Sequence, residues 1–297
     1  MSGIAAQYTA PMLSYRHAYH AGNHADVLKH LILLQIAHYM GEKAAPFWII
    51  DTHAGAGCYT LDAPHAMKLA EWQEGIGRLW QASGLPPAAA DYLDFVRMLN
   101  PDGALKHYPG SPWLARQCLR DSDRLRLFEL HSSDARLLRE NFRTAGRQVN
   151  ITEGDGLAGL KALLPPPPRR ALVLIDPSYE TSNDYSAVIK TLQDALTRFA
   201  TGTYALWYPL LPKREARELP ERLKRLGRDS RHKFNWLNAS LEVRAPDRQG
   251  FGMYGSGMFI INPPWTLEKT LHATLPVLTR LLAQDDNARY VLESETD

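Results

Sequence analysis

Short apolar segments alternate with longer amphipathic stretches along most of the chain. The apolar segments are four to six residues long, as buried strands are, and most of the intervals between them have the length and periodicity of helices. We predict strands at residues 47–51, 125–130, 149–152, 171–175, 204–208, 240–243 and 257–261. Apolar strands separated by helices are typical of a doubly wound sheet, so the predicted class is α/β.

A helix that is apolar almost all round is predicted near the N-terminus, over residues 27–40 and the turn before them. Asn23 is a natural N-cap, and Asp26 follows where a carboxylate suits the positive end of a helix. The stretch from Leu31 to Ile36 is apolar on most sides, so this helix is expected to be buried on more than one face.

The interval between the first two strands is too long for a simple crossover. It contains two amphipathic helical patterns, at residues 72–80 and 92–99, and we expect residues 60–108 to form a small helical insertion. The remaining parts are then a main domain of residues 12–59 and 109–297 and a polar, non-periodic, flexible extension of residues 1–11.

The composition excludes several classes of protein. Hydrophobic residues make up 45% and charged residues 22%, which is ordinary for a folded soluble protein. No apolar run approaches the roughly 18 residues of a membrane span, and the first basic residue is Arg16, which does not fit a signal peptide. Two cysteines are too few for a disulfide framework. We expect a cytoplasmic, monomeric protein without a membrane partner.

The distribution of charge is uneven. The 34 basic and 32 acidic residues give a net charge of +2, which as an average argues against a nucleic-acid partner. Residues 213–233, however, contain nine Lys or Arg and four Asp or Glu, a local net charge of +5. This segment fits either a solvated helix face or a surface that contacts phosphates.

Polar residues at the ends of the predicted strands suggest an adenosine site. In a doubly wound sheet, ligands bind at the carboxyl ends of the strands. The loop of residues 51–57 has two spaced glycines, although not the full G-x-G-x-x-G of dinucleotide binding. Glu129 ends the second strand, where a carboxylate can accept from both ribose hydroxyls, and Asp155 follows the third, where it can accept from an adenine amino group. Each feature alone also fits an ordinary turn; together they favour adenosine.

The segment Asp176-Pro177-Ser178-Tyr179, after the fourth predicted strand, indicates the chemistry of the site. The exocyclic amine of adenine is a poor nucleophile, because its lone pair is delocalised into the ring. The Asp176 carboxylate and the Pro177 carbonyl can accept the two N–H bonds of such an amine, and Tyr179 can stack on the base. Positioning and electrostatics then do most of the catalysis. A strand-terminating Asp-Pro turn is the alternative interpretation.

Two further features have more than one interpretation. The N-terminal histidines, His17, His20, His24 and His30, fit a zinc hydrolase in spacing, but HExxH is absent and no carboxylate stands at a matching ligand spacing. Hydrogen bonding around a cofactor is the favoured account, and we expect no metal. Ser111 opens a predicted helix as its N-cap, and the free N–H groups there either hold a carboxylate or are simply capped.

The motifs together resemble a known family. They comprise residues 12–17, 20–30, 51–57, 108–112, the strand into Asp176, 200–209 and 261–265. On these residues the chain resembles the ribosomal RNA large subunit methyltransferase J family, which methylates N6 of an adenine in 23S rRNA. The resemblance implies a class I S-adenosylmethionine-dependent methyltransferase fold, with a Rossmann-like seven-stranded sheet and a helical insertion.

The resemblance also implies roles for individual residues. Contacts to S-adenosylmethionine are expected from Lys29, His30, His53, Ser111, Glu129, Asp155, Gly156 and Asp176. Asp176 is the expected catalytic residue, and Tyr15 is expected to touch the RNA. Pro177 and Tyr179 complete the expected substrate contacts, and 23S rRNA is the expected partner.

Two sequence details qualify this assignment. The family has Asp-Pro-Pro-Tyr where this chain has Ser178 in third place, which frees the backbone of the loop and is expected to lower the rate. Asn262-Pro263-Pro264-Trp265 is a closer match in spelling, but it follows the last strand, which runs antiparallel in such sheets and ends at the opposite edge. The alternatives are an RNA-binding or assembly protein with weakened catalysis, a metal-dependent hydrolase and a DNA adenine methyltransferase.

Overall fold

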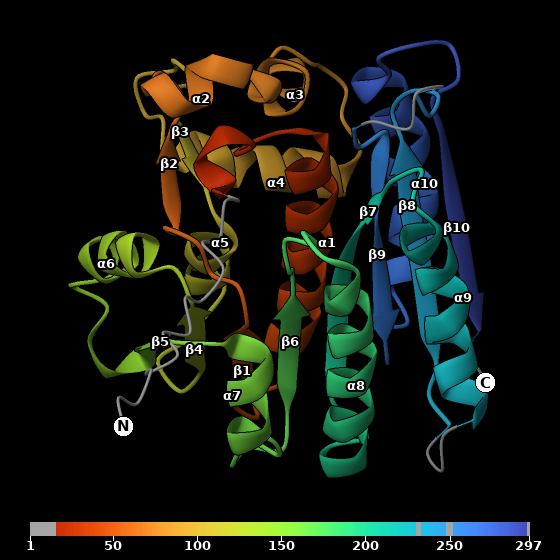
Figure 1. Cartoon of the computed structure of the whole chain (residues 1–297). Coiled ribbons are helices and arrows are strands. Elements are labelled where there is room, and N and C mark those ends of the chain that lie inside the picture. Colours follow the sequence, from red (N-terminus) through yellow and green to blue (C-terminus); the bar gives the residue numbers. More distant parts are fainter. Residues whose placement is uncertain (1–15, 230–232, 248–251, 296–297) are drawn as a thin grey trace, which may run out of the picture.

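One eight-stranded sheet forms the centre of the computed structural model, which describes residues 16–229, 233–247 and 252–295. The strands are β1 (Trp48–Asp51), β4 (Arg124–Glu129), β5 (Val149–Glu153), β6 (Ala171–Ile175), β7 (Thr203–Leu210), β8 (Trp236–Glu242), β9 (Gly255–Ile261) and β10 (Arg289–Glu295). Their order across the sheet is β10-β8-β9-β7-β6-β1-β4-β5 (Figure 1).

The sheet combines a parallel half with an antiparallel half. Strands β5, β4, β1, β6 and β7 run parallel, so their carboxyl ends share one edge of the sheet. Strands β9, β8 and β10 are antiparallel to their neighbours. The predicted doubly wound α/β class is confirmed, and all seven predicted strands are present. The eighth, β10, was not predicted, because its half-exposed sequence is rich in charge and its apolar run is only three residues long.

Helices cover both faces of the sheet (Figure 1). One face packs against α1 (His24–Gly41), α5 (Ser111–Gln117) and α10 (Leu267–Leu282), and the other against α7 (Gly156–Leu163), α8 (Ser182–Arg198) and α9 (Arg214–Asp229). The helix α6 (Ser132–Asn141) follows β4. Strand β6 shows the two faces directly, because Leu172 and Leu174 join the first core while Val173 and Ile175 join the second.

The first long helix is buried as the sequence predicted. Asn23 precedes α1, and its side chain accepts hydrogen bonds from the backbone of Ala25 and Asp26. Fourteen of the 18 residues of α1 are buried, including the charged residues Asp26 and Lys29. A short 3-10 helix, η1 (His17–Tyr19), leads into this helix. Charged side chains that are this buried need partners, and those partners lie in the candidate site.

Four short helices lie between Thr60 and His107. They are α2 (Pro64–Leu69), η2 (Glu71–Gln73), α3 (Ile76–Trp80) and α4 (Pro87–Met98), and β2 (Cys58–Thr60) pairs antiparallel with β3 (His107–Pro109) at their base. The predicted helical patterns correspond to η2 with α3 and to α4. Figure 1 shows α2 and α3 above the end of the sheet toward which β6 points. The domain boundaries themselves stay a prediction, and residues 1–11 and Tyr15 lie outside the described residues.

The segment Asn262-Pro263-Pro264-Trp265 lies at the other edge of the sheet, as its antiparallel strand requires. The amide of Asn262 donates to the carbonyls of Ala200 and Gly202, at 2.8 and 2.7 Å, just before the start of β7. Asn262 therefore holds the turn between α8 and β7 and is remote from the carboxyl ends of the parallel strands.

Candidate active site

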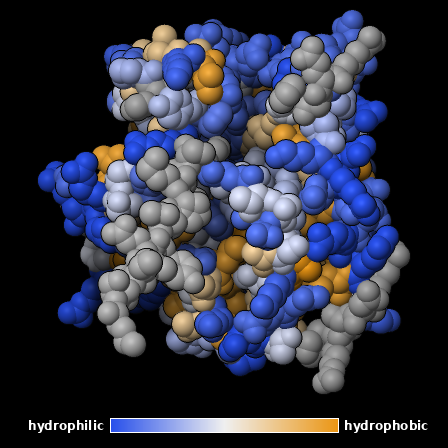
Figure 2. All heavy atoms as spheres, viewed as in Figure 1, coloured by the Kyte–Doolittle hydropathy of each residue, from blue (hydrophilic) through white to orange (hydrophobic). Residues whose placement is uncertain are grey.

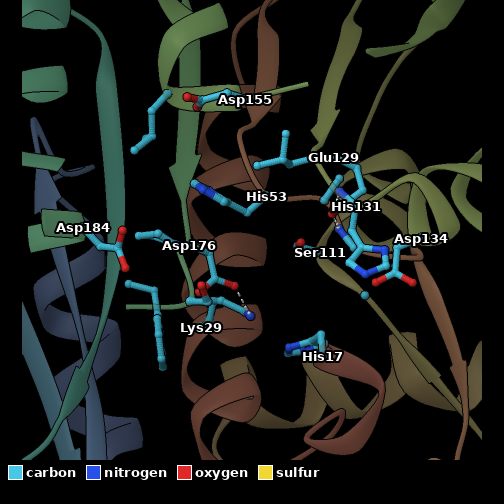
Figure 3. Close-up of a pocket in the computed structure, with 18 of the residues that line it drawn as sticks. His17, Lys29, His53, Ser111, Glu129, His131, Asp134, Asp155, Asp176 and Asp184 are labelled. Atoms are coloured by element: carbon cyan, nitrogen blue, oxygen red, sulfur yellow. Dashed lines mark hydrogen bonds and ion pairs between the residues drawn. The ribbon is translucent and has the colours of Figure 1, made fainter. Parts of the chain in front are cut away.

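A cavity of about 310 Å³ opens at the carboxyl edge of the parallel strands. Successive strand ends contribute to it: His53 follows β1, Glu129 ends β4, Asp155 follows β5 and Asp176 follows β6. Figure 3 shows these side chains converging from different strands, with Lys29 of α1 beside Asp176. The predicted site residues that line the cavity are Lys29, His30, His53, Ser111, Glu129, Asp155, Asp176 and Pro177.

Glu129 is fixed by the backbone of two loops. Its carboxylate accepts a hydrogen bond from the amide of Gly55 at 2.8 Å and another from the amide of His131 at 2.6 Å. Burial raises the pKa of Glu129 above its ordinary value, although these two amides oppose the shift. Each carboxylate oxygen has a second lone pair, so the group can still accept from a diol.

Asp155 caps α7 and faces the cavity at the same time. Its Oδ1 accepts from the amide of Ala158 at 3.1 Å, while the side chain lines the cavity. Gly156, the first residue of α7, does not line the cavity. A Cβ at Gly156 would lie 2.1 Å from the carbonyl oxygen of Thr52, so glycine is required for backbone packing.

Hydrogen bonding determines the tautomer of His53. The Thr52 hydroxyl has one hydrogen, which it donates to the carbonyl of Leu174 at 3.0 Å. His53 Nδ1 lies 2.8 Å from the same hydroxyl and must therefore donate to it. Burial lowers the pKa of His53, which favours the neutral ring. Nε2 is then a hydrogen-bond acceptor in the lining of the cavity.

His30 carries a buried ring nitrogen with no hydrogen-bond partner in the described part of the chain. Its Nδ1 lies 2.8 Å from the hydroxyl of Tyr108, and that hydroxyl lies 2.8 Å from the hydroxyl of Tyr92. Within the described residues, Nε2 of His30 is buried without a hydrogen-bond partner. Burial lowers the pKa of His30 to about 3, so the ring is neutral. Nε2 lies 3.8 Å from Asp26 Oδ1, so this side of the ring packs against the carboxylate at the start of α1.

Ser111 does not have the capping role that its sequence suggested. Gly110 occupies the N-cap position of α5, Ser111 begins the helix, and its hydroxyl donates to Asp51 Oδ2 at 2.7 Å. The predicted N-cap was therefore wrong by one residue, because the buried carboxylate of Asp51 competes for the hydroxyl. Burial raises the pKa of Asp51 to about 6, although the bond from Ser111 opposes the shift.

The charged centre of the site is an array of three groups. Lys29 Nζ lies 2.6 Å from Asp176 Oδ2 and 2.8 Å from Asp26 Oδ1. Burial lowers the pKa of Lys29, but the two carboxylates more than offset this and bring it above its ordinary value. Burial raises the pKa of Asp26, but His17 and Lys29 outweigh it and hold the pKa well below its ordinary value. Lys29 is thus a buried cation between two carboxyl groups.

A second cavity of about 180 Å³ lies on the other side of this array. It shares His17, Lys29, Asp176, Ser178 and Trp207 with the first cavity. Its remaining lining combines the polar side chains of His20, Asn23 and Asp26 with the apolar side chains of Ala25, Pro209, Leu211 and Met253. Asp176 therefore lines both the cavity at the strand ends and a second cavity with a partly apolar wall.

Tyr179 is not placed where the sequence interpretation expected it. Its ring is 3% exposed and contacts Tyr185 and Trp207, and its hydroxyl donates to the carbonyl of Trp207 at 2.9 Å. The residue has a φ of 51°, a left-handed conformation that turns the loop after Ser178. Tyr179 lines neither cavity here, whereas the indole of Trp207 lines both. Stacking of a base on Tyr179 stays a prediction and requires this loop to rearrange.

Several lining residues were not assigned to the site from the sequence. They are His131, Asp134, Glu180, Asp184 and Trp207, and His17 was considered only as a polar packing or metal residue. His131 and Asp134 follow Glu129 closely, so position after a strand end was an available signal. Asp184 and Trp207 carry no such signal, because one is in a helix and the other is inside a strand.

The N-terminal histidines have different surroundings. His17 Nε2 lies 2.9 Å from Asp26, and His20 Nδ1 lies 3.0 Å from Glu71. His30 contacts Tyr108, and His24 is buried in α1. In the part of the chain that the structure describes, no cluster of three or more His, Cys, Asp or Glu side chains is arranged to hold a metal ion. Within the same ranges, no helix combines the length and apolarity that crossing a membrane requires.

Comparison with known proteins agrees with this geometry. Residues 44–293 match the family model described as ribosomal RNA large subunit methyltransferase D, RlmJ. The chain is 45% identical over 270 residues to ribosomal RNA large subunit methyltransferase J of Escherichia coli K12, covering 90% of this chain and 93% of that protein. It is 43% identical over 283 residues to the protein of that name from Haemophilus influenzae, covering 95% and 98%.

A solved structure is also similar. The crystal structure of protein LPL1258 from Legionella pneumophila matches with a TM-score of 0.83 and 33% identity, covering 93% of this chain and 98% of that one. The resemblance read from the sequence motifs is confirmed by the family model and by both curated relatives. The chain belongs to the ribosomal RNA large subunit methyltransferase J family.

Proposed function

We propose that this enzyme transfers a methyl group from S-adenosylmethionine to N6 of an adenine in 23S rRNA. The observation that carries the proposal is the position of Asp176 between two cavities, with Lys29 bound to one of its oxygens at 2.6 Å. One cavity has the donor and acceptor groups that the cofactor needs, and the other has the apolar wall that a base needs. Family membership supports the same reaction.

The side chains of the first cavity fit S-adenosylmethionine from end to end. Asp155 would accept from the adenine amino group, and Glu129, held by two amides, would accept from the ribose hydroxyls. At the other end, the side chain of His30, the Nε2 of His53 and the hydroxyl of Ser111 would hold the polar groups of the methionine part. When bound, S-adenosylmethionine supplies an electrophilic methyl group on a positively charged sulfur.

The second cavity would receive the flipped adenine. A base must leave its stack to reach such a pocket, and an apolar or aromatic wall stabilises it there. Trp207, Pro209 and Leu211 provide that wall beside Asp176. In the present conformation Trp207, rather than Tyr179, is the aromatic side chain available to the base.

Asp176 would orient the amine of the base. Lys29 binds Oδ2 of Asp176, which leaves Oδ1 to accept one N–H bond of the amine, and the carbonyl of Pro177 would accept the other. This arrangement directs the nitrogen lone pair toward the first cavity, so that catalysis rests on positioning and on fixed charges. Ser178 lines both cavities in the place of the family's second proline.

The test is transfer of a tritiated methyl group to 23S rRNA from cells that lack the activity, followed by nucleoside analysis. The proposal expects the label in N6-methyladenosine at a single site. No transfer would contradict it and would favour an RNA-binding or assembly role. Equal labelling of duplex DNA would favour a DNA methyltransferase instead. RNA cleavage that depends on an added metal would favour a hydrolase.

A further inference from the structure

The turn that leads into α1 is held by a residue of the helical insertion. Glu71, in η2, accepts a hydrogen bond from the side-chain amide of Asn23 at 2.9 Å. Both carboxylate oxygens of Glu71 also lie 3.0 Å from Nδ1 of His20. Burial raises the pKa of Glu71, but the bonds from His20 and Asn23 outweigh it and lower the pKa below its ordinary value. Glu71 is therefore a carboxylate that binds two side chains of this turn.

The backbone of the same turn is in direct contact with the insertion. The amide of Ile76 donates to the carbonyl of Gly22 at 2.8 Å. A Cβ on Gly75 would lie 2.0 Å from that carbonyl oxygen, and a Cβ on Gly22 would lie 2.9 Å from the side chain of Ile76. The two glycines thus let the backbones of the turn and the insertion pack without space for a side chain. This packing leaves the turn little freedom while the insertion stays in place.

The turn in its own right sets the position of Asp26. The side chain of Asn23 caps the amides of Ala25 and Asp26, each at 3.0 Å. The amide of Gly22 donates to Asp26 Oδ2 at 2.9 Å. The other oxygen, Oδ1, binds Lys29 at 2.8 Å. A displaced turn would thus rotate or withdraw the carboxylate that holds Lys29.

We propose that Glu71 is a positioning residue for methyl transfer, which acts through Asn23 and Asp26 on Lys29 and so on Asp176. The inference rests on the proposed function, because the Lys29–Asp176 pair has a catalytic role only if the enzyme methylates adenine. Glu71 lines neither cavity, so its effect must pass through the turn. The helical insertion is on this account a support for the charged centre.

The first experiment measures the burial of Lys29 without any substrate. Lys29 is 3% exposed, so its amine is expected to resist acetylation by acetic anhydride in the native enzyme. Replacing Glu71 by Ala is expected to raise the labelling rate of Lys29 by about fivefold or more, because local opening exposes it. Glu74→Ala is the matched control, since Glu74 lies three residues on in the insertion and its side chain is 55% exposed. Equal labelling in the two variants would overturn the inference.

The second experiment measures the single-turnover rate at saturating cofactor and RNA. Glu71→Ala is expected to slow transfer by about tenfold, since small displacements of reacting groups are costly. Its affinity for S-adenosylmethionine should change by less than about threefold, so the loss appears in the rate. Glu71→Gln keeps an acceptor for Asn23 and is expected to recover part of the rate. In a Lys29→Gln background, Glu71→Ala should have no further effect.

The outcomes separate this inference from the proposed function. If the unmodified enzyme transfers no methyl group to rRNA, the proposed function fails, whatever the labelling of Lys29 shows. If it does transfer, but Glu71→Ala and Glu74→Ala have the same rate, the positioning role of Glu71 is excluded. A rate loss that persists unchanged in the Lys29→Gln background would also exclude it, because Glu71 would then act by another route.

Discussion

Lys29 Nζ lies 2.6 Å from Asp176 Oδ2, although the two residues are 147 positions apart in the sequence. The lysine comes from the first buried helix and the aspartate from the end of β6. The contact fixes Oδ2 of Asp176, and in the proposed reaction Oδ1 accepts from the amine of the substrate. Most of the predicted behaviour of the enzyme follows from this pair and the groups around it.

Replacement of Lys29 by Met is expected to lower the single-turnover rate by about 100-fold, because Asp176 loses the partner that orients it. The loss also leaves Asp26 buried without its cation, and breaking a buried pair costs about 3–5 kcal/mol in the free energy of unfolding. Denaturant unfolding should therefore accompany the kinetics. Lys190→Met, at an exposed position of α8, is the control. A Lys29→Met enzyme with the original rate would contradict the assigned role.

Replacement of Glu129 by Gln is expected to weaken the binding of S-adenosylmethionine by about tenfold, since the neutral amide gives up a charge-assisted acceptor. Isothermal titration measures this directly. Glu153 pairs with Glu129 in the register of β4 and β5 but lies on an exposed position with Arg139 as its partner. Glu153→Gln should bind the cofactor normally. Equal affinities for both variants would remove Glu129 from the cofactor site.

The basic helix α9 is expected to contact RNA phosphates. It begins three residues after Leu211, which lines the second cavity, so RNA that enters this cavity passes close to it. Arg214 and Lys224 are engaged in ion pairs, whereas Arg217 and Arg225 are exposed. Figure 2 shows mainly hydrophilic side chains over this helix, on the right of the view.

Reversing the charge of Arg217 and Arg225 to Glu should weaken RNA binding and reduce the slope of log affinity against log salt by about 1 to 2. Filter binding over a series of salt concentrations gives that slope. The same double reversal of Arg136 and Arg143, which are exposed on and just after α6, is the control. If the α9 reversal leaves the slope unchanged, the basic face of this helix contacts solvent and not RNA phosphates.

The stability of the protein is expected to depend on pH through His24. Burial lowers the pKa of His24 to about 4 from an ordinary value of 6.5. Below pH 6.5 the unfolded chain binds a proton that the folded chain does not, so folding stability falls as the pH is lowered toward 4. Between pH 7 and 5 this amounts to about 2 kcal/mol.

Glutamine does not titrate, so the His24→Gln variant lacks this pH dependence. The gap in unfolding free energy between the variant and the original protein should therefore change by about 2 kcal/mol from pH 7 to pH 5. Denaturant titrations at pH 7 and pH 5 measure it. Parallel pH profiles for the original protein and His24→Gln would show that His24 is not buried as a neutral ring.

The sheet was predictable because its strands are apolar runs and its ligand edge follows from their direction. Glu129, Asp155 and Asp176 all stand at the ends of parallel strands, so their convergence in one cavity required no knowledge of side-chain packing. Strand β10 is an edge strand, half exposed to solvent, so its apolar run is limited to three residues and periodicity gave no indication of it.

The contacts that organise the charged centre could not be read from the sequence. The pairing of Lys29 with Asp176, and of Glu71 with Asn23, depends on how α1 and the insertion pack against the sheet. The inward turn of Tyr179 depends on its left-handed backbone and on the carbonyl of Trp207 as an acceptor. The pairings and the orientation of Tyr179 are consequences of tertiary packing, which the local pattern of apolar and polar residues does not reveal.

The most direct measurement is the single-turnover rate of Asp176→Asn with 23S rRNA, together with its affinity for S-adenosylmethionine. Asparagine has the shape of aspartate but lacks the charge that orients the amine and pairs with Lys29. The account predicts a rate at least about 100-fold below the original, with cofactor affinity within about tenfold. Methylation by Asp176→Asn at the original rate would contradict it.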